Sequence, residues 1–242
     1  MKRSLAIVSL LSLTILCGSV IAMGGPKPEE SKAPEKQAGV ERPAAFAEKV
    51  FLIDDYESGS LKFPRDWWVF DVKADVVSTD TLKDGEALEV GLKSLSLAGS
   101  ASNFYVGGIG TYLAKEGQDL SKYNSMQIDI YGNGPDSGSL KIELYDDDNG
   151  NWQVEQDKTK NYVPFYDDKW TNEIKVDWSG WKRVVVPLAD FVDENPAIGD
   201  DIWNPQQMSN SGGLLQLQLI CIATKSKGKV GFDLDNVALI VE

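Results

Sequence analysis

Residues 177–191 read Asp-Trp-Ser-Gly-Trp-Lys-Arg-Val-Val-Val-Pro-Leu-Ala-Asp-Phe, and they carry a clear strand signal. Ser179-Gly180 is a turn signal, and the β-branched run after it predicts a strand over Trp181–Val186. Pro187 has no backbone N–H to donate to a sheet ladder, so the strand should end there. Leu188–Phe191 is then expected to form a short turn. The stretch predicts one complete strand of a β-protein.

Strand signals of this kind recur along the chain between clusters of Gly, Pro, Asn and Asp, whereas no helix-length periodicity of 3.6 residues is present. Short strands without crossover helices predict an all-β fold, an antiparallel two-sheet β-sandwich. The expected strands are Val50–Tyr56, Trp67–Val77, Ala87–Leu92, Phe104–Leu113, Met126–Tyr131, Leu140–Tyr145, Trp152–Gln156, Tyr162–Val176, Trp181–Val186, Leu214–Ala223 and Val230–Val241.

Three stretches carry a resemblance to a known family. Gly180–Phe191 reads almost as the motif G-W-K-x-V-x-x-P-L-x-D-F of that family. Asp54–Glu57 and Asp233–Leu239 match the family's motifs in the first and last strands of the domain. On these stretches the chain resembles the jelly-roll carbohydrate-binding modules of the galactose-binding-like superfamily. It looks most like family 11 modules and domains akin to complex I intermediate-associated protein 30. The resemblance implies that Trp178 and Trp181 pack between the sheets.

The N-terminal residues predict export. Residues 1–22 combine a basic start, the apolar run Leu5–Leu16 and small residues before position 23, which is typical of a secretory signal peptide and too short for a membrane span. Cys17 leaves a lipoprotein open, although Leu16 precedes it where a small side chain is expected. Residues 23–49, rich in Pro, Lys, Glu and Ala, predict a flexible linker. Residues 50–242 are expected to form the sandwich domain of a secreted, periplasmic or cell-envelope protein.

Composition excludes several functions. The formal net charge is −13, so binding to nucleic acid is opposed by the field of the protein, and partners should be neutral or cationic. The chain contains no histidine, which excludes Ser-His-Asp and Cys-His catalysis and most zinc sites. Cys221 lies in an apolar run and is predicted to be a buried hydrophobic residue rather than a nucleophile.

Carboxylates at both ends of the domain predict a metal site. Strand alternation places Asp55 beside Glu57 and Asp233 beside Asp235, and the change in apolar spacing predicts a bulge near Asp235. An all-oxygen ligand set suits Ca²⁺. The family resemblance also implies that the first and last strands lie side by side and that a structural calcium ties them. Solvent-exposed charge is the alternative. The candidate ligands are Asp54, Asp55, Glu57, Asp233 and Asp235.

A second acidic stretch, Asp146–Asn151, fails the EF-hand pattern because Gly150 falls where a ligand is needed. It is predicted to be a polar turn between strands.

Polar strand faces predict a sugar-binding surface. Sugar rings stack their C–H patches on aromatic faces, while amides and carboxylates bind the hydroxyl groups. Three cleanly alternating strands present such residues opposite their apolar faces, and nearby loops add tryptophan and tyrosine. These residues form a binding surface only if they share one face of a sheet. For each aromatic residue taken alone, packing in the core is the alternative. The candidates are Gln127, Asp129, Tyr131, Glu143, Tyr145, Trp152, Tyr166, Trp170, Gln216 and Gln218.

The sequence therefore predicts a secreted, non-catalytic protein that binds a neutral, β-glucan-like polysaccharide. One alternative is an envelope scaffold that kept the fold without glycan binding and associates with a cell-surface or enzyme-complex protein. The other is a two-carboxylate glycoside hydrolase, for which Glu143 with Asp129 is the pair to test.

Overall fold

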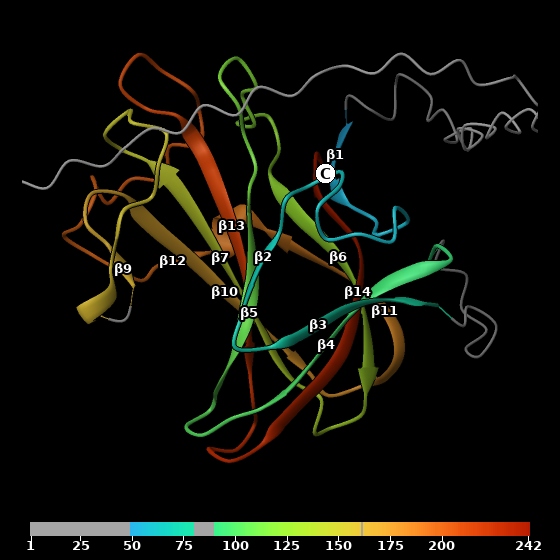
Figure 1. The fold of residues 1–242 in the computed structure, drawn as a ribbon. Coiled ribbons are helices and arrows are strands. Elements are labelled where there is room, and N and C mark those ends of the chain that lie inside the picture. The colour runs from blue at the N-terminus through green and yellow to red at the C-terminus, as the bar shows by residue number, and fades with distance from the viewer. Residues whose placement is uncertain (1–48, 80–89, 161) are drawn as a thin grey trace, which may run out of the picture. The chain divides into compact units, whose positions relative to one another are not determined.

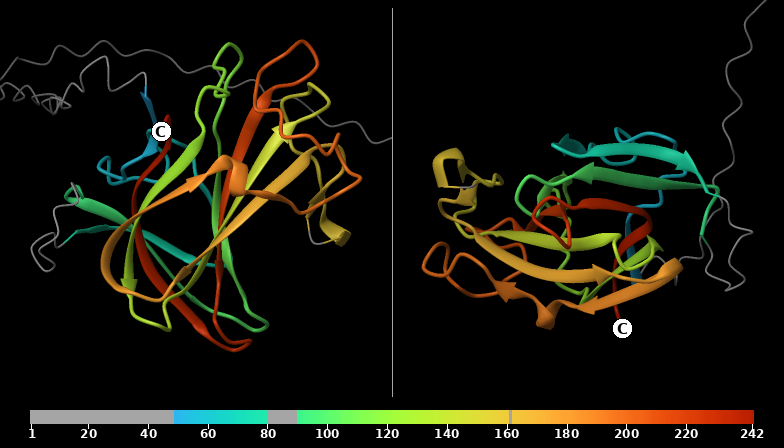
Figure 2. Two further views of the ribbon diagram at one scale, coloured as in Figure 1. Left: turned by 180° about the vertical axis from the view of Figure 1, so that it is seen from behind. Right: turned by 90° about the horizontal axis from the view of Figure 1, so that it is seen from below.

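Two antiparallel sheets pack face to face in the computed structural model, which describes residues 49–79, 90–160 and 162–242 (Figure 1). The first sheet has the order β11-β6-β14-β4-β3, with β1 also paired to β14, and the second has the order β12-β10-β7-β13-β5-β2. Figure 2 shows the two layers from behind and from below. The predicted all-β sandwich is confirmed. The predicted signal peptide and nearly all of the predicted linker lie outside the described residues.

The strands of the first sheet are β1 Val50–Asp54, β3 Lys73–Ser78, β4 Lys93–Ser100, β6 Ser125–Asn133, β11 Ser179–Pro187 and β14 Lys229–Ile240. Those of the second are β2 Trp68–Phe70, β5 Tyr105–Tyr112, β7 Gly138–Asp147, β10 Asp168–Val176, β12 Val192–Asp193 and β13 Gly213–Ile222. A separate small pair consists of β8 Gln156–Asp157 and β9 Val163–Pro164, and two 3₁₀ turns are η1 Lys158–Lys160 and η2 Leu188–Asp190.

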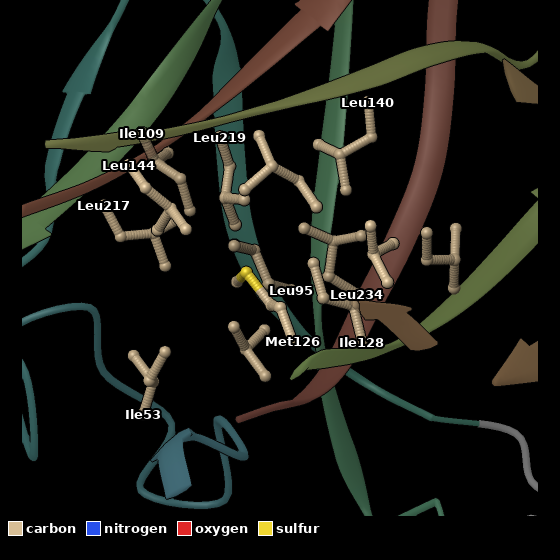
Figure 3. Packing of buried hydrophobic residues seen from close by; sticks show 14 of the residues in the cluster. Ile53, Leu95, Ile109, Met126, Ile128, Leu140, Leu144, Leu217, Leu219 and Leu234 are labelled. Carbon is tan, nitrogen blue, oxygen red and sulfur yellow. The ribbon is translucent and has the colours of Figure 1, made fainter. Parts of the chain in front are cut away.

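The core lies between the two sheets and is built by alternation along their strands. Every second residue of a strand points to the same face, so the apolar residues of facing strands meet. Figure 3 shows Leu95, Ile128 and Leu234 of the first sheet beside Leu144, Leu217 and Leu219 of the second. Cys221 belongs to this cluster, and burial raises the pKa of its thiol to about 12. It is therefore a buried apolar residue, as predicted.

Residues 177–191 contain β11, which ends at Pro187 as predicted and is followed by η2. It is an edge strand, paired with β6 alone among the described strands. Trp181 lies opposite Tyr131, and their rings meet edge to face at 5.5 Å on the outer face of the sheet. The prediction that Trp181 packs between the sheets is therefore wrong, because Val184 and Val186 take the inward positions of this strand. Trp178 is half-buried against the core.

Several strand boundaries differ from prediction. The expected strand Tyr162–Val176 is divided between β9 and β10, only Gln156 of Trp152–Gln156 lies in a strand, and the described residues 90–92 of Ala87–Leu92 are not in a strand. The expected strand Trp67–Val77 is divided between β2 and β3, which belong to different sheets, because the chain passes from one sheet to the other at Asp71, whose φ is 56°. Strand β4 was not predicted, since its Ser, Ala and Gly residues have low strand propensity. Burial of Leu95 and Leu97 at alternate positions nevertheless makes it part of the core.

The two ends of the domain lie side by side, as the resemblance implied. Strand β1 pairs antiparallel with β14, and Val50 lies opposite Ile240. The register of β14 against β6 shifts between Asp235 and Ala238, and Asn236 has a φ of 47°. The predicted bulge near Asp235 is confirmed.

Candidate functional site

A groove of about 740 Å³ lies on the outer face of the second sheet. Strands β2, β5, β7, β10 and β13 form its floor, and the residues that face it alternate with core residues on the same strands. Its lining is aromatic, amide and charged: Trp68, Phe70, Asp71, Ser102, Asn103, Tyr105, Glu143, Tyr145, Gln156, Lys158, Tyr162, Lys169, Gln218 and Ile220.

Glycines of β5 allow aromatic rings to lie flat on the groove floor. A Cβ added at Gly110 would overlap the indole of Trp68, and one at Gly108 would lie 2.5 Å from the Leu219 carbonyl oxygen and 3.0 Å from the Phe70 ring. The Trp68 ring therefore occupies the space that a side chain at Gly110 would fill. Tyr112 then packs against Trp68 with ring centroids 5.7 Å apart. This part of β5 is shaped to hold an aromatic platform.

Two exposed tyrosines stand at the groove. Tyr105 is 46% exposed and Tyr162 is 57% exposed. Partial burial, followed by the charge of Asp71, raises the pKa of Tyr105 to about 12, so its hydroxyl stays protonated and can donate a hydrogen bond. Each ring offers a large apolar face together with a polar group, which suits contact with a polar ligand that has apolar patches.

Charges at the groove floor are paired. Tyr145 donates a hydrogen bond from its hydroxyl to Glu143 Oε2 at 2.8 Å, and Lys141 lies 3.3 Å from Glu143 Oε1. Lys169 lies 2.7 Å from Glu194, which Lys141 also contacts. Burial alone would lower the pKa of Lys141, but its contacts with Glu194 and Glu143 outweigh burial and raise it. The positive charges of two lysines thus balance the negative charges of two glutamates, which favours a ligand without net charge.

The predicted sugar-binding set is divided between the two sheets. Glu143, Tyr145 and Gln218 line the groove, and Gln216 lies on the same face of β13. Tyr145 is only 1% exposed, so it can support Glu143 but has no free ring face for stacking.

Gln127, Asp129 and Tyr131 lie on β6, in the other sheet, so the prediction of one shared face is wrong for these three. Asp129 is fully buried and binds the Arg183 guanidinium through two hydrogen bonds of 2.8 Å. Alternation correctly separated inward from outward positions, but it could not say which sheet a strand joins.

Three loop or strand aromatics are not part of the groove lining. Trp170 packs against Trp203 at a centroid distance of 5.7 Å and donates its indole N–H to Asp146. Trp152 has a φ of 63° and lies over Gly212. Tyr166 is exposed and contacts Phe165. Their predicted contribution to sugar binding is not supported by these positions.

The structure does not gather the predicted calcium ligands into one cluster. Asp54 accepts hydrogen bonds from the Trp67 indole and the Tyr56 amide, and Glu57 accepts one from the Lys93 amide. Asp235 accepts hydrogen bonds from the amides of Gly91 and Asn236. No three of the five candidates Asp54, Asp55, Glu57, Asp233 and Asp235 meet within 4.8 Å in the part of the chain described. That these residues share one calcium ion stays a prediction.

A different acidic group could hold a metal ion. Oxygens of Asp146, Asp148 and Asp168 all lie within 4.8 Å of one another. Burial, reinforced by the neighbouring carboxylates, raises the pKa of Asp146 to about 8 and that of Asp168 to about 7. The prediction of a simple polar turn at Asp146–Asn151 missed this group. Asp168 joins it only because β10 pairs with β7 and places Asp168 opposite Asp146.

Sequence reasoning also missed the groove residues Trp68, Tyr105, Tyr162 and Lys169. The available signal was the run Gly107-Gly108-Ile109-Gly110 in β5. Glycine inside a strand marks close approach of another group, here the rings of β2.

No family model matches the chain, and no curated protein matches it. Among solved structures, the fold is similar to that of a family 11 carbohydrate-binding module from Clostridium thermocellum in complex with a β-1,3-1,4-mixed-linked tetrasaccharide. That module is 19% identical, with a TM-score of 0.48 over 79% of this chain and 95% of the module. A family 28 module specific for non-crystalline cellulose is 16% identical, with a TM-score of 0.43 over 79% of this chain and 94% of the module. Family 11 modules are thus among the structures to which this fold is similar, as the sequence resemblance predicted.

Proposed function

We propose that this chain is a non-catalytic carbohydrate-binding protein whose groove on the second sheet binds a neutral, β-glucan-like polysaccharide. The observation that carries the proposal is the groove itself. Its aromatic rings are exposed or half-exposed, and its floor consists of amides and of lysine and glutamate side chains that form ion pairs. Aromatic faces suit the C–H patches of sugar rings, and the paired Glu143 and Lys169 can exchange hydrogen bonds with hydroxyl groups without requiring a charged ligand.

The separation of Glu143 from Asp129 supports a non-catalytic role for this pair. Glycosidases need their two carboxylates on either side of one bond, about 5–9.5 Å apart. Here Glu143 lies on the second sheet, whereas Asp129 lies buried on the first with Arg183. A structural calcium at the paired chain ends is not part of the proposal, because no three of its candidate ligands lie within 4.8 Å of one another among the described residues.

We also propose that the protein is exported, on the strength of the signal-like residues 1–22. Within the three described ranges, no helix is long and apolar enough to cross a membrane. Fractionation of cells that express the whole chain tests this proposal. Recovery of the unprocessed chain in the cytoplasm alone would refute it.

Electrophoresis in native gels that contain a glycan tests the groove. We expect the chain to be retarded in native gels that contain a soluble β-glucan, and Tyr105→Ala to weaken that affinity about tenfold or more, the equivalent of roughly 1.4 kcal/mol. Tyr131→Ala is the matched control, since Tyr131 is a tyrosine on the outer face of the opposite sheet. Equal loss in both variants, or no retention of the parent on β-glucan, xylan or mannan gels, would refute the proposal.

Gly110→Ala tests the aromatic platform. The added Cβ would overlap the Trp68 ring and displace it, so we expect weaker retention on the same β-glucan gels and a lower melting temperature. Gly231→Ala is the control, because a Cβ at this mid-strand glycine of β14 meets nothing closer than 4.0 Å. Such a substitution should be neutral or stabilise by about 0.4–1 kcal/mol. Unchanged retention by Gly110→Ala would show that the position of Trp68 does not matter for binding.

A further inference from the structure

Three carboxylates converge where β7 ends and β10 begins. Asp146 and Asp168 lie opposite each other in the register of these strands, and Asp148 follows directly after β7. Asp146 and Asp168 are fully buried, and Asp148 is half-buried. Their ligand oxygens lie within 4.8 Å of one another, so three carboxyl groups that repel one another when ionised share a small volume with little access to water.

Backbone and indole donors satisfy only part of this group. Asp146 accepts hydrogen bonds from the Trp170 indole at 3.0 Å and the Asn204 amide at 3.0 Å. Asp148 Oδ2 accepts one from the Asp168 amide at 2.9 Å, and Asp168 Oδ2 accepts one from the Ile202 amide at 3.1 Å. These contacts orient the carboxylates toward one another, and they supply no positive charge.

Several buried oxygens in this group have no hydrogen-bond partner. They are Oδ1 of Asp168, whose side chain is fully buried, Oδ1 of Asp148 and Oδ1 of Asn204. No lysine or arginine in the described ranges forms an ion pair with Asp146, Asp148 or Asp168. A buried carboxylate oxygen without a partner is costly, and native proteins normally satisfy it with a donor, a water or an ion.

The adjoining loop approaches the carboxylates closely at a glycine. Gly199 has a φ of 81°, and a Cβ there would overlap Oδ1 of Asp168 and Oδ2 of Asp148. A glycine therefore keeps this side of the carboxylates clear of any side chain.

We propose that Asp146, Asp148 and Asp168 bind a Ca²⁺ ion, with Asn204 Oδ1 as a further oxygen ligand. Carboxylate and amide oxygens are hard ligands that select Ca²⁺ or Mg²⁺ over softer transition metals. Ca²⁺ accepts about six to eight oxygens in irregular arrangements, whereas Mg²⁺ demands near-octahedral geometry. A group drawn from two strands and the 195–204 loop suits the more permissive ion. The ion would tie that loop to the ends of β7 and β10.

The test is the melting temperature of the whole chain, first in EDTA and then with 1 mM Ca²⁺. Since a ligand that binds only the folded state stabilises it, we expect Ca²⁺ to raise the melting temperature by about 5–10 °C. Tb³⁺ added in place of Ca²⁺ should show luminescence sensitised by tryptophan, because the Trp170 indole contacts Asp146. No shift with Ca²⁺, or an equal shift with 1 mM Mg²⁺, would overturn the assignment.

Two isosteric variants locate the ion. Asp148→Asn and Asp168→Asn should each lose most of the Ca²⁺ shift and the Tb³⁺ signal. In EDTA they should melt no lower than the parent, because each removes one of three mutually repelling charges. Asp233→Asn is the control, since Asp233 belongs to the carboxylates at the chain ends, and it should respond to Ca²⁺ as the parent does. A response kept in the first two variants and lost in Asp233→Asn would overturn the proposal.

Discussion

Trp67→Ala is expected to lower the free energy of unfolding by about 3–5 kcal/mol, the range typical for removal of a buried aromatic side chain. Trp67 is fully buried, where its ring packs against that of Tyr56 at a centroid distance of 6.3 Å. Its indole N–H also donates to Asp54 Oδ2 at 2.8 Å, and Asp54 is itself fully buried. The substitution removes packing and leaves a buried carboxylate oxygen without this donor.

Chemical denaturation of Trp67→Ala and Trp67→Phe separates the two contributions. The phenylalanine variant keeps most of the ring and loses the hydrogen bond, so we expect a cost of about 1–3 kcal/mol. Asp54→Asn in the Trp67→Phe background should recover part of that cost, because the buried group is then uncharged. If Trp67→Ala cost less than 1 kcal/mol, the contact between the start of β2 and the end of β1 would not be important for stability.

Arg183→Met is expected to destabilise the fold by about 3 kcal/mol without changing affinity for glycan. Removal of one partner of a buried ion pair costs about 3–5 kcal/mol, and the lower end applies because Arg183 is 39% exposed. Asp129 would keep the hydrogen bond from the Asn236 side chain at 3.0 Å but lose both bonds from the guanidinium. Glycan affinity should stay the same, because Asp129 lies on the sheet opposite the groove.

The control for this prediction is Lys225→Met. Lys225 pairs with Asp136 at 3.3 Å, and both side chains are more than 70% exposed. An exposed pair of this kind contributes about 0–1 kcal/mol, so this variant should unfold at nearly the same denaturant concentration as the parent. Loss of retention by folded Arg183→Met on β-glucan would restore Asp129 as a candidate ligand residue and contradict the site described above.

Period-2 alternation allowed most of the fold to be predicted from the sequence. Strong apolar alternation in β7 and β13 identified the residues that meet in the core, and Pro187 fixed the end of β11. Strand β4 was not predicted because its Ser and Gly residues have little strand propensity. Its two buried leucines stabilise the strand only through tertiary packing.

The groove was harder to predict, since it depends on which strands become neighbours. Glu143 and Gln218 were recognised because they alternate with core residues on their own strands. Trp68 and Tyr105 were missed because their position depends on the pairing of β2 with β5, a contact between segments about forty residues apart. Local pattern decides whether a residue faces in or out, but only the sheet order decides which outward residues share a surface.

The edge position of β11 has a consequence for association between molecules. An edge strand offers backbone N–H and C=O groups on which a strand from another chain can assemble. Exposed Lys182 places a positive charge along this edge, and Pro187 withholds a donor where the strand ends. Two copies that approached edge to edge would therefore bring like charges together, and the backbone hydrogen bonds between them would be interrupted at Pro187. The residues that define the strand also oppose its extension into an intermolecular sheet.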